Sequence, residues 1–182
     1  YMASAGIHTV LKPLADIHPA FPFSALTTVQ EIAGRTKGNA IIIAPTGSGK
    51  TEAALFWATY NLDATLGNRV FYTLPYSASI NAMYLRLKNA LSRQYAGDET
   101  CVSLMHGKAA YYLWKFYEEK KRFDYVKSIS KRIYSPYKVM TPYQSIKHFF
   151  SLKGYEMGLL EMYRGLFIFD EIHAYDAKNS AL

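Results

Sequence analysis

The chain has 182 residues and a formal net charge of +7, and half of its residues are hydrophobic. This length fits one domain spanning residues 1–182, and the apolar content excludes a disordered or collagen-like chain. Its apolar runs are much shorter than the roughly 20 residues that span a bilayer, and no secretory signal opens it, so we expect an intracellular protein with no membrane contact.

The first half of the chain predicts a strand, a glycine loop and a helix in that order. A helix is expected from Ala25 to Arg35, and the apolar run Ala40–Ala44 is typical of a strand buried on both faces. The glycine-containing segment Pro45–Thr51 comes next. An Ala- and Leu-rich helix is then expected from Glu52 to Ala64.

The second half continues the alternation of helices and strands. A helix is expected over Ser77–Ala96, another begins near Ala109, and Thr141 and Pro142 cap and open a third. The expected strands are Val70–Leu74, Thr100–Met105, Lys138–Met140 and Leu166–Phe169. This spacing predicts an α/β fold with a parallel, doubly wound sheet and helices on both faces, whose ligands lie at the carboxyl ends of the strands.

The segment after the first expected strand has the pattern of a phosphate-binding loop, with Ala44 where the strict pattern has glycine. Glycines let backbone N–H groups turn toward phosphate oxygens, a lysine adds a cation near the β- and γ-phosphates, and a threonine hydroxyl ligates Mg²⁺. An ordinary Gly/Ser turn is the alternative, but a buried strand and a good helix flank this segment. The expected nucleotide-binding residues are Pro45, Thr46, Gly47, Ser48, Gly49, Lys50 and Thr51.

Two adjacent carboxylates, Asp170 and Glu171, stand at the end of the last expected strand. One acid placed there holds the Mg²⁺ that bridges the phosphates, and the other orients and deprotonates the attacking water. Alternatively the pair caps a following helix, because acids are common near helix N-termini. The phosphate-binding loop, expected on a neighbouring strand, favours the first interpretation, with Thr51 and Asp170 as metal ligands and Glu171 as general base.

These motifs together resemble the superfamily 2 helicases and translocases, whose acidic motif reads Asp-Glu-x-His. This chain has Asp170-Glu171-Ile172-His173 at that place. The resemblance implies a RecA-like P-loop NTPase domain that binds ATP and Mg²⁺ and hydrolyses ATP. It further implies that Lys50 and Glu171 act in catalysis and that His173 relays the state of the γ-phosphate.

Three further segments match motifs of the same superfamily. Phe23–Gln30 is similar to the adenine-reading motif, which implies that Gln30 hydrogen-bonds the base, although a glutamine on a helix surface is the alternative. Thr73–Ser77 and Val139–Gln144 are similar to motifs that line the groove for single-stranded nucleic acid. The nucleic-acid contacts that this implies are Pro75, Tyr76, Ser77, Thr141 and Gln144.

Within the superfamily, the chain is most similar to the helicases of type I CRISPR interference. The ending His173-Ala174-Tyr175-Asp176 is the most distinctive segment, and the resemblance runs from about Phe21 to the C-terminus. It implies an ATP-dependent helicase of the prokaryotic cytoplasm, which an RNA-guided surveillance complex of the Cascade type recruits to unwind and move along single-stranded target DNA. An HD nuclease domain or subunit then degrades the DNA, and no His-Asp dipeptide occurs in this chain.

Two parts of a complete motor of this kind do not occur within the 182 residues. They are the Ser-Ala-Thr motif and the second RecA-like domain with its arginine finger, which the resemblance implies. Such a finger is worth on the order of 10³–10⁵ in rate in related phosphoryl transfers. We therefore expect these residues alone to bind ATP but to hydrolyse it very slowly.

The segment Lys108–Lys138 is the candidate insertion, expected to be helical, and it holds nine Lys or Arg, three Asp or Glu and nine aromatic residues. Cations that track phosphates beside rings that stack on bases make a single-strand binding surface. The alternative is a helix that packs its aromatic side chains inward and keeps its cations solvated. The near-helical spacing of Tyr112, Phe116 and Phe123 favours this alternative.

Two other functions are compatible with the motifs. One is another superfamily 2 DNA or RNA helicase, because motifs that grip the backbone do not by themselves distinguish the sugars. The other is a non-catalytic, nucleotide-dependent binding module, in which the basic segment docks a partner. A small-molecule kinase is not supported, because it leaves the Asp170–His173 motif and the Gln30 segment unexplained.

Overall fold

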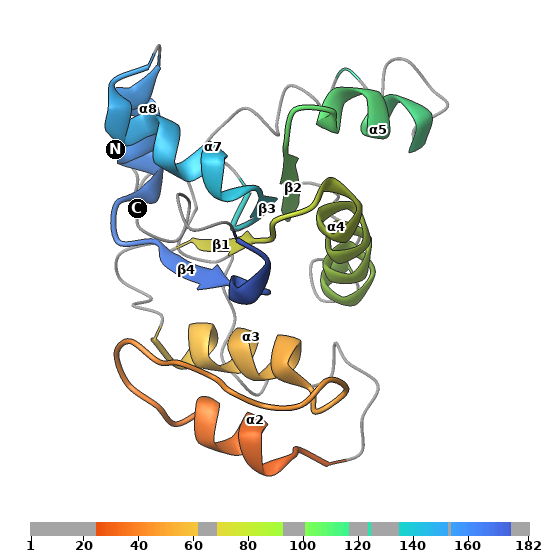
Figure 1. The fold of residues 1–182 in the computed structure, drawn as a ribbon, viewed down its shortest axis with the longest axis vertical. Coiled ribbons are helices and arrows are strands. Elements are labelled where there is room, and N and C mark those ends of the chain that lie inside the picture. Colours follow the sequence, from red (N-terminus) through yellow and green to blue (C-terminus); the bar gives the residue numbers. More distant parts are fainter. Residues whose placement is uncertain are drawn as a thin grey trace. The chain divides into compact units, whose positions relative to one another are not determined.

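The computed structural model describes residues 25–61, 69–92, 101–116, 124, 135–152 and 154–175 (Figure 1). It divides into two compact units, residues 1–68 and residues 69–182.

The described part of the first unit consists of two helices and the loop between them. Helix α2 (Thr28–Ala33) begins at Thr27, whose hydroxyl accepts a hydrogen bond from the Gln30 amide in a capping box. Helix α3 (Lys50–Asn61) begins directly after the glycine loop. Asn61, the last residue of α3, fixes the start of the loop that follows α2. Its side chain accepts from the Gly38 amide at 2.7 Å and donates to the Thr36 carbonyl at 2.8 Å.

The apolar run 40–44 differs from its prediction as a strand buried on both faces. The segment is assigned to no strand, and Ile41 and Ile43 are 89% and 91% exposed. A strand needs a neighbour for its ladder of backbone hydrogen bonds. The described residues of this unit are otherwise two helices and a loop, so the run has no partner strand among them.

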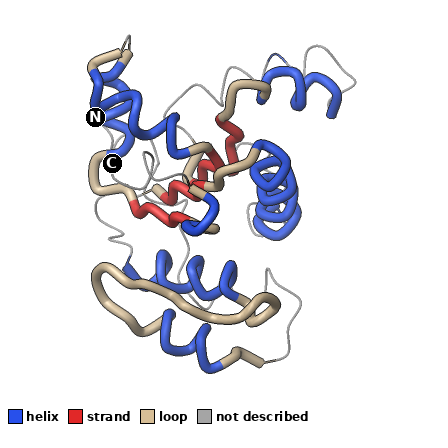
Figure 2. The backbone as a smooth tube through the Cα atoms, in the orientation of Figure 1, coloured by secondary structure: helices blue, strands red, loops and turns tan. Residues whose placement is uncertain are grey.

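The second unit is built on a four-stranded parallel sheet, whose arrows run through the centre of this unit in Figure 1 and whose strands are red in Figure 2. Its strands are β1 (Val70–Thr73), β2 (Val102–Met105), β3 (Tyr137–Met140) and β4 (Leu166–Phe169), in the order β2-β3-β1-β4. In register, Tyr72 lies beside Val139 on one side and Ile168 on the other. The four strands predicted in this part of the chain are thus confirmed, to within two residues at their ends.

Helices cover both sides of this sheet, as the doubly wound prediction requires (Figure 1). On one side, helix α4 contacts β2 and β3; on the other, Met162 packs with Phe71 and Met140. Residues 93–96 of the predicted helix 77–96 lie outside the described residues. The helical elements of this unit are α4 (Ser77–Ser92), α5 (Ala109–Phe116), α7 (Pro142–Ile146), η4 (Lys147–Phe150), α8 (Tyr155–Met162) and η5 (Ile172–Ala174).

The expected insertion 108–138 is described only in part. Helix α5 accounts for its first residues, residues 117–123 and 125–134 lie outside the described residues, and the end of the segment belongs to β3. Tyr137 and Lys138 are 2% and 1% exposed, so they are core residues of the sheet and cannot belong to a binding surface. The insertion itself stays a prediction.

A buried ion pair fastens α8 to the sheet. Lys138 lies on the same face of the sheet as Met140, and its ammonium pairs with the carboxylate of Glu161 on α8. Arg69, also buried, donates to the Glu161 carbonyl at 3.5 Å. Burial lowers the pKa of Lys138, and the neighbouring Glu161 carboxylate works against that shift.

We expect Glu161→Gln to destabilise the fold by about 3 kcal/mol, because it removes the carboxylate that offsets a buried lysine. The free energy of unfolding in urea is the measurement. Glu156→Gln is the matched control, since Glu156 lies on the same helix and is exposed. Equal stability of the two variants would show that the ion pair does not hold α8 in place.

Candidate nucleotide and nucleic-acid site

The glycine loop before α3 has the backbone conformation that a phosphate-binding loop needs. Gly47 and Gly49 have φ values of +83° and +82°, which residues other than glycine rarely adopt. A Cβ at Gly49 would also collide with the amide of Gln30. The Ser48 amide closes the turn onto the Pro45 carbonyl at 3.3 Å. Both glycines are therefore required by the shape of the loop.

Lys50, Thr51 and Ser48 place polar groups around this loop. The Lys50 ammonium donates to the carbonyls of Ala44 and Pro45, at 2.8 and 2.9 Å, and so lies over the loop. Thr51 follows in the first turn of α3, where the helix N-terminus favours negative charge. The hydroxyl of Ser48 is buried and has no hydrogen-bond partner among the described residues. Such a group fits a bound phosphate oxygen.

Gln30 is buried beside this loop and its amide already has partners. Its Oε1 accepts from the Thr27 amide at 2.9 Å, and its Nε2 donates to the Gly49 carbonyl at 3.4 Å. The structure thus gives Gln30 a positioning contact with the loop, and it excludes the alternative of a surface glutamine, because only 4% of Gln30 is exposed. A contact of Gln30 with a nucleotide base stays a prediction.

In the second unit, Asp170 is held at the carboxyl end of β4. Its amide donates to the Thr73 carbonyl at 3.1 Å, which continues the ladder between β4 and β1. The phenol of Tyr72 donates to Asp170 Oδ2 at 2.6 Å, and the Glu171 amide donates to Oδ1 at 2.9 Å. These three contacts fix the carboxylate at the edge of the sheet.

Glu171 and His173 lie exposed next to Asp170. Glu171 has a left-handed backbone with φ of +56°, which turns the chain sharply after the strand. The His173 Nε2 atom lies 3.3 Å from a carboxylate oxygen of Glu171, and the two side chains are 81% and 50% exposed. Both groups are therefore accessible to a ligand at this edge.

The predicted nucleic-acid contacts lie at the same edge of the sheet. Pro75, Tyr76 and Ser77 follow β1, and Thr141 and Gln144 follow β3, its neighbour. Tyr76 and Ser77 are exposed and the other three are partly exposed. The carboxyl ends of parallel strands meet at one edge, so these residues and Asp170 share it.

Sequence reasoning missed three residues that shape this edge: Tyr72, Asn81 and Tyr175. Tyr72 is 98 residues from the aspartate that it holds, and Tyr175 donates to the Thr73 carbonyl at 3.3 Å from 102 residues away. Burial raises the pKa of Tyr175, and the nearby Asp170 and Glu171 carboxylates add to that shift. No local pattern marks either contact, although Tyr175 belongs to the distinctive His-Ala-Tyr-Asp ending.

A family model described as "DEAD/DEAH box helicase" matches residues 25–181. The chain belongs to this helicase family. Among curated relatives of this DEAD/DEAH box domain, it is 29% identical over 158 residues to the CRISPR-associated endonuclease/helicase Cas3 of Thermus thermophilus, covering 78% of this chain and 17% of that protein. It is 30% identical over 144 residues to a putative CRISPR-associated nuclease/helicase Cas3 of Methanocaldococcus jannaschii, covering 75% and 19%.

Solved structures support the same fold for the helicase domain. The chain matches the crystal structure of T. fusca Cas3-ATP with a TM-score of 0.67 and 25% identity, over 93% of this chain and 20% of that one. The structure of T. fusca Cas3-AMPPNP gives a TM-score of 0.66 at 23% identity. The RecA-like α/β fold is thereby confirmed. The chain spans about a fifth of the length of these relatives.

None of the described helices of this DEAD/DEAH box domain combines the length and the apolar character that crossing a membrane requires.

His106 provides a pH-sensitive contact at the turn from β2 into α5. Its Nδ1 accepts from the Lys108 amide at 3.3 Å, so Nε2 carries the proton and donates to Asn81 Oδ1 at 2.8 Å. Burial lowers the pKa of His106 below its ordinary value of 6.5. This arrangement supports a structural role for the neutral ring.

We expect the domain to lose stability as the pH falls from 6.5 toward the lowered pKa of folded His106. In that window the unfolded chain binds the proton more readily, so protonation favours unfolding. Above pH 6.5 the neutral His106 ring contributes its full stabilisation to the folded state. Urea unfolding at several pH values measures the loss, which should be smaller in His106→Gln. The remaining loss comes partly from His148, whose pKa burial also lowers.

Proposed function

We propose that this chain is the ATP-binding half of a motor that moves along single-stranded DNA in CRISPR type I interference. The observation that carries this proposal is the shared sheet edge, where Asp170 and Glu171 follow β4 while the predicted nucleic-acid contacts follow β1 and β3. Because the proposed catalytic carboxylates and the proposed DNA contacts lie at one edge of one sheet, a movement of one group of residues during ATP hydrolysis can move the other.

The glycine loop is proposed to hold the phosphates of ATP. The positive φ values of Gly47 and Gly49, the position of Lys50 over the loop and the buried Ser48 hydroxyl all suit phosphate oxygens. On binding, the Lys50 ammonium exchanges its loop carbonyls for phosphate oxygens. Pro45 and Thr46 are exposed at the rim of the loop, where they would flank the bound nucleotide.

Thr51 and Asp170 are the residues proposed to hold Mg²⁺. Among the described residues, no group of three or more His, Cys, Asp or Glu side chains could hold a metal ion by itself. Mg²⁺ in nucleotide sites is commonly bound by one or two protein groups together with the phosphates. When bound, the ion neutralises developing phosphate charge. Tyr72 then acts as a positioning residue, because its hydrogen bond fixes the direction of the Asp170 carboxylate.

Glu171 is proposed as the general base that orients and deprotonates the attacking water. Its exposed carboxylate lies next to the fixed Asp170, and its left-handed backbone turns it away from the strand direction. His173, whose Nε2 lies 3.3 Å from Glu171, is proposed to relay the state of the γ-phosphate. Expressed alone, these residues should bind ATP and hydrolyse it very slowly, since a second domain with an arginine finger is not among them.

The proposed partners rest on the resemblance to the helicases of type I CRISPR interference, and the names of the relatives, which combine nuclease, helicase and CRISPR association, support it. We propose single-stranded DNA as the track, a Cascade-type surveillance complex as the recruiting partner and an HD nuclease domain or subunit as the enzyme that cuts. The proposed setting is the prokaryotic cytoplasm.

The direct test is Lys50→Ala in the full native protein that contains this chain. We expect at least a hundredfold loss of DNA-stimulated ATP hydrolysis, because the variant lacks the cation beside the phosphates. Lys37→Ala is the matched control, since Lys37 is exposed in the same unit and lies 6.0 Å from the Tyr60 ring.

Two outcomes would count against the motor. Unchanged hydrolysis in Lys50→Ala would contradict the assignment of the phosphate loop. ATP binding that is lost in Lys50→Ala, with no response of the wild-type hydrolysis rate to DNA or RNA, would instead favour the nucleotide-dependent binding module. Stimulation by RNA in preference to DNA would assign an RNA helicase.

A further inference from the structure

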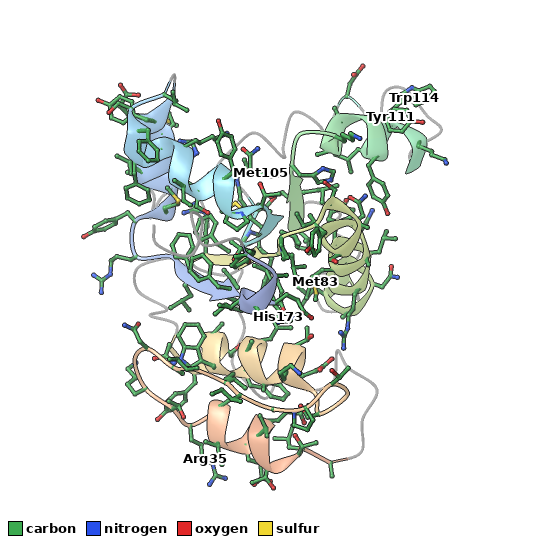
Figure 3. The ribbon with its side chains drawn as sticks, in the orientation of Figure 1. Arg35, Met83, Met105, Tyr111, Trp114 and His173 are labelled. Atoms are coloured by element: carbon green, nitrogen blue, oxygen red, sulfur yellow. The ribbon has the colours of Figure 1, made fainter. Side chains whose placement is uncertain are left out.

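Helix α5 carries two large aromatic side chains that face away from the core. Tyr111 and Trp114 are 66% and 61% exposed, and their ring centroids lie 6.3 Å apart with the planes tilted by 32° (Figure 3). The same helix anchors itself through Ala109 and Leu113, which are buried. The aromatic pair therefore lies on the exposed face of α5, whose other face is buried.

Two lysines flank this aromatic pair. Lys108 lies three residues before Tyr111, Lys115 lies four residues after it, and both are exposed. Residues three and four apart share one face of a helix, so Lys108, Tyr111, Trp114 and Lys115 form one outward stripe, called here the α5 stripe. No acidic residue occurs in α5. The α5 stripe therefore combines exposed aromatic rings with positive charges and contains no negative charge.

The α5 stripe begins at the same sheet edge as the predicted nucleic-acid contacts. Helix α5 follows β2, and β2 pairs with β3, whose carboxyl end leads into Thr141. The Thr141 amide donates to the Met105 carbonyl at 3.4 Å, which ties the two strand ends together. In the order β2-β3-β1, the segments that follow the strands carry exposed aromatic side chains: Tyr111 and Trp114 after β2, Tyr143 after β3, and Tyr76 after β1.

We propose that the α5 stripe is a stacking platform for single-stranded DNA, with Tyr111 and Trp114 against the bases and Lys108 and Lys115 on the phosphates. This proposal rests on the proposed function and extends its DNA path beyond the motif residues to the β2 side of the sheet. Stacking on aromatic rings beside cations binds single strands without sequence preference. A duplex hides its base faces, so the platform selects unpaired DNA.

The charge of the surrounding sequence favours DNA over an apolar protein partner. Residues 108–138 hold nine Lys or Arg and three Asp or Glu, and electrostatic attraction to phosphates supplies most non-specific DNA affinity. The exposure of Tyr111 and Trp114 also argues against the interpretation that this segment packs its aromatics inward. Tyr112, by contrast, is half-buried, so the platform uses one face of the helix only.

The test compares two oligonucleotides of equal length, oligo(dT) and an abasic oligomer with the same phosphates, by fluorescence anisotropy on the full native protein. In the double variant Tyr111→Ala/Trp114→Ala, we expect affinity for oligo(dT) to fall about ten- to a hundredfold. Affinity for the abasic oligomer should not change. The control is Tyr163→Ala, because Tyr163 is 69% exposed but precedes β4 at the opposite edge of the sheet.

Tyr111→Phe/Trp114→Phe should restore oligo(dT) affinity, because it keeps the aromatic rings. An equal loss for both oligomers, or no loss for oligo(dT), would overturn stacking. If wild-type protein binds neither oligomer, the proposed DNA motor fails as well, whereas wild-type binding that the double variant retains removes only the platform. Tighter binding of oligo(U) than oligo(dT) would reassign the platform to RNA.

Discussion

The hydrogen bond from the Asp170 amide to the Thr73 carbonyl, 3.1 Å long, extends the ladder between β1 and β4 one residue beyond β4. Because both strands run in the same direction, this bond sets Asp170 beside the end of β1, where the Tyr72 phenol reaches its carboxylate at 2.6 Å. A one-residue slip in register would turn each of these side chains to the other face. The positions of the carboxylates, of the predicted nucleic-acid contacts and of the α5 stripe all depend on this parallel alignment, since it gathers the carboxyl ends of four strands at one edge.

Four strands and their order along the chain were predictable, because each is a short apolar run followed by a helix pattern. The run 40–44 satisfied the same pattern, but it has no partner strand among the described residues of its unit, and Ile41 and Ile43 are exposed. An apolar sequence forms a strand only when a neighbouring strand completes its ladder of hydrogen bonds. Helix α8 was not predicted, since residues such as Met157 and Leu160 are exposed and obscure its buried face. Lys138 reads as a surface cation in sequence, yet the Glu161 carboxylate permits it to lie in the core.

The shape of the glycine loop could be predicted because it is local: two glycines supply the positive φ values and the following helix supplies its N-terminus. The supporting contacts could not be predicted, because they join residues far apart in sequence, as Tyr72 and Asp170 do. Gln30 is an example of this difference between local and long-range contacts. A contact with the nucleotide base was predicted for it and stays a prediction, whereas its contacts with Thr27 in the capping box and with Gly49 are visible only in the folded backbone.

The central proposal is that Thr51 and Asp170 hold the same Mg²⁺ together with ATP, as the resemblance to the superfamily 2 helicases implies. A double-mutant cycle between Thr51→Ala and Asp170→Asn tests it, with DNA-stimulated ATP hydrolysis measured in the full native protein at several Mg²⁺ concentrations. If the two side chains share one ion, the double variant should be scarcely slower than the slower single variant, with a coupling energy of more than about 1 kcal/mol. Effects that add to within about 0.5 kcal/mol would show independent sites and would contradict the account.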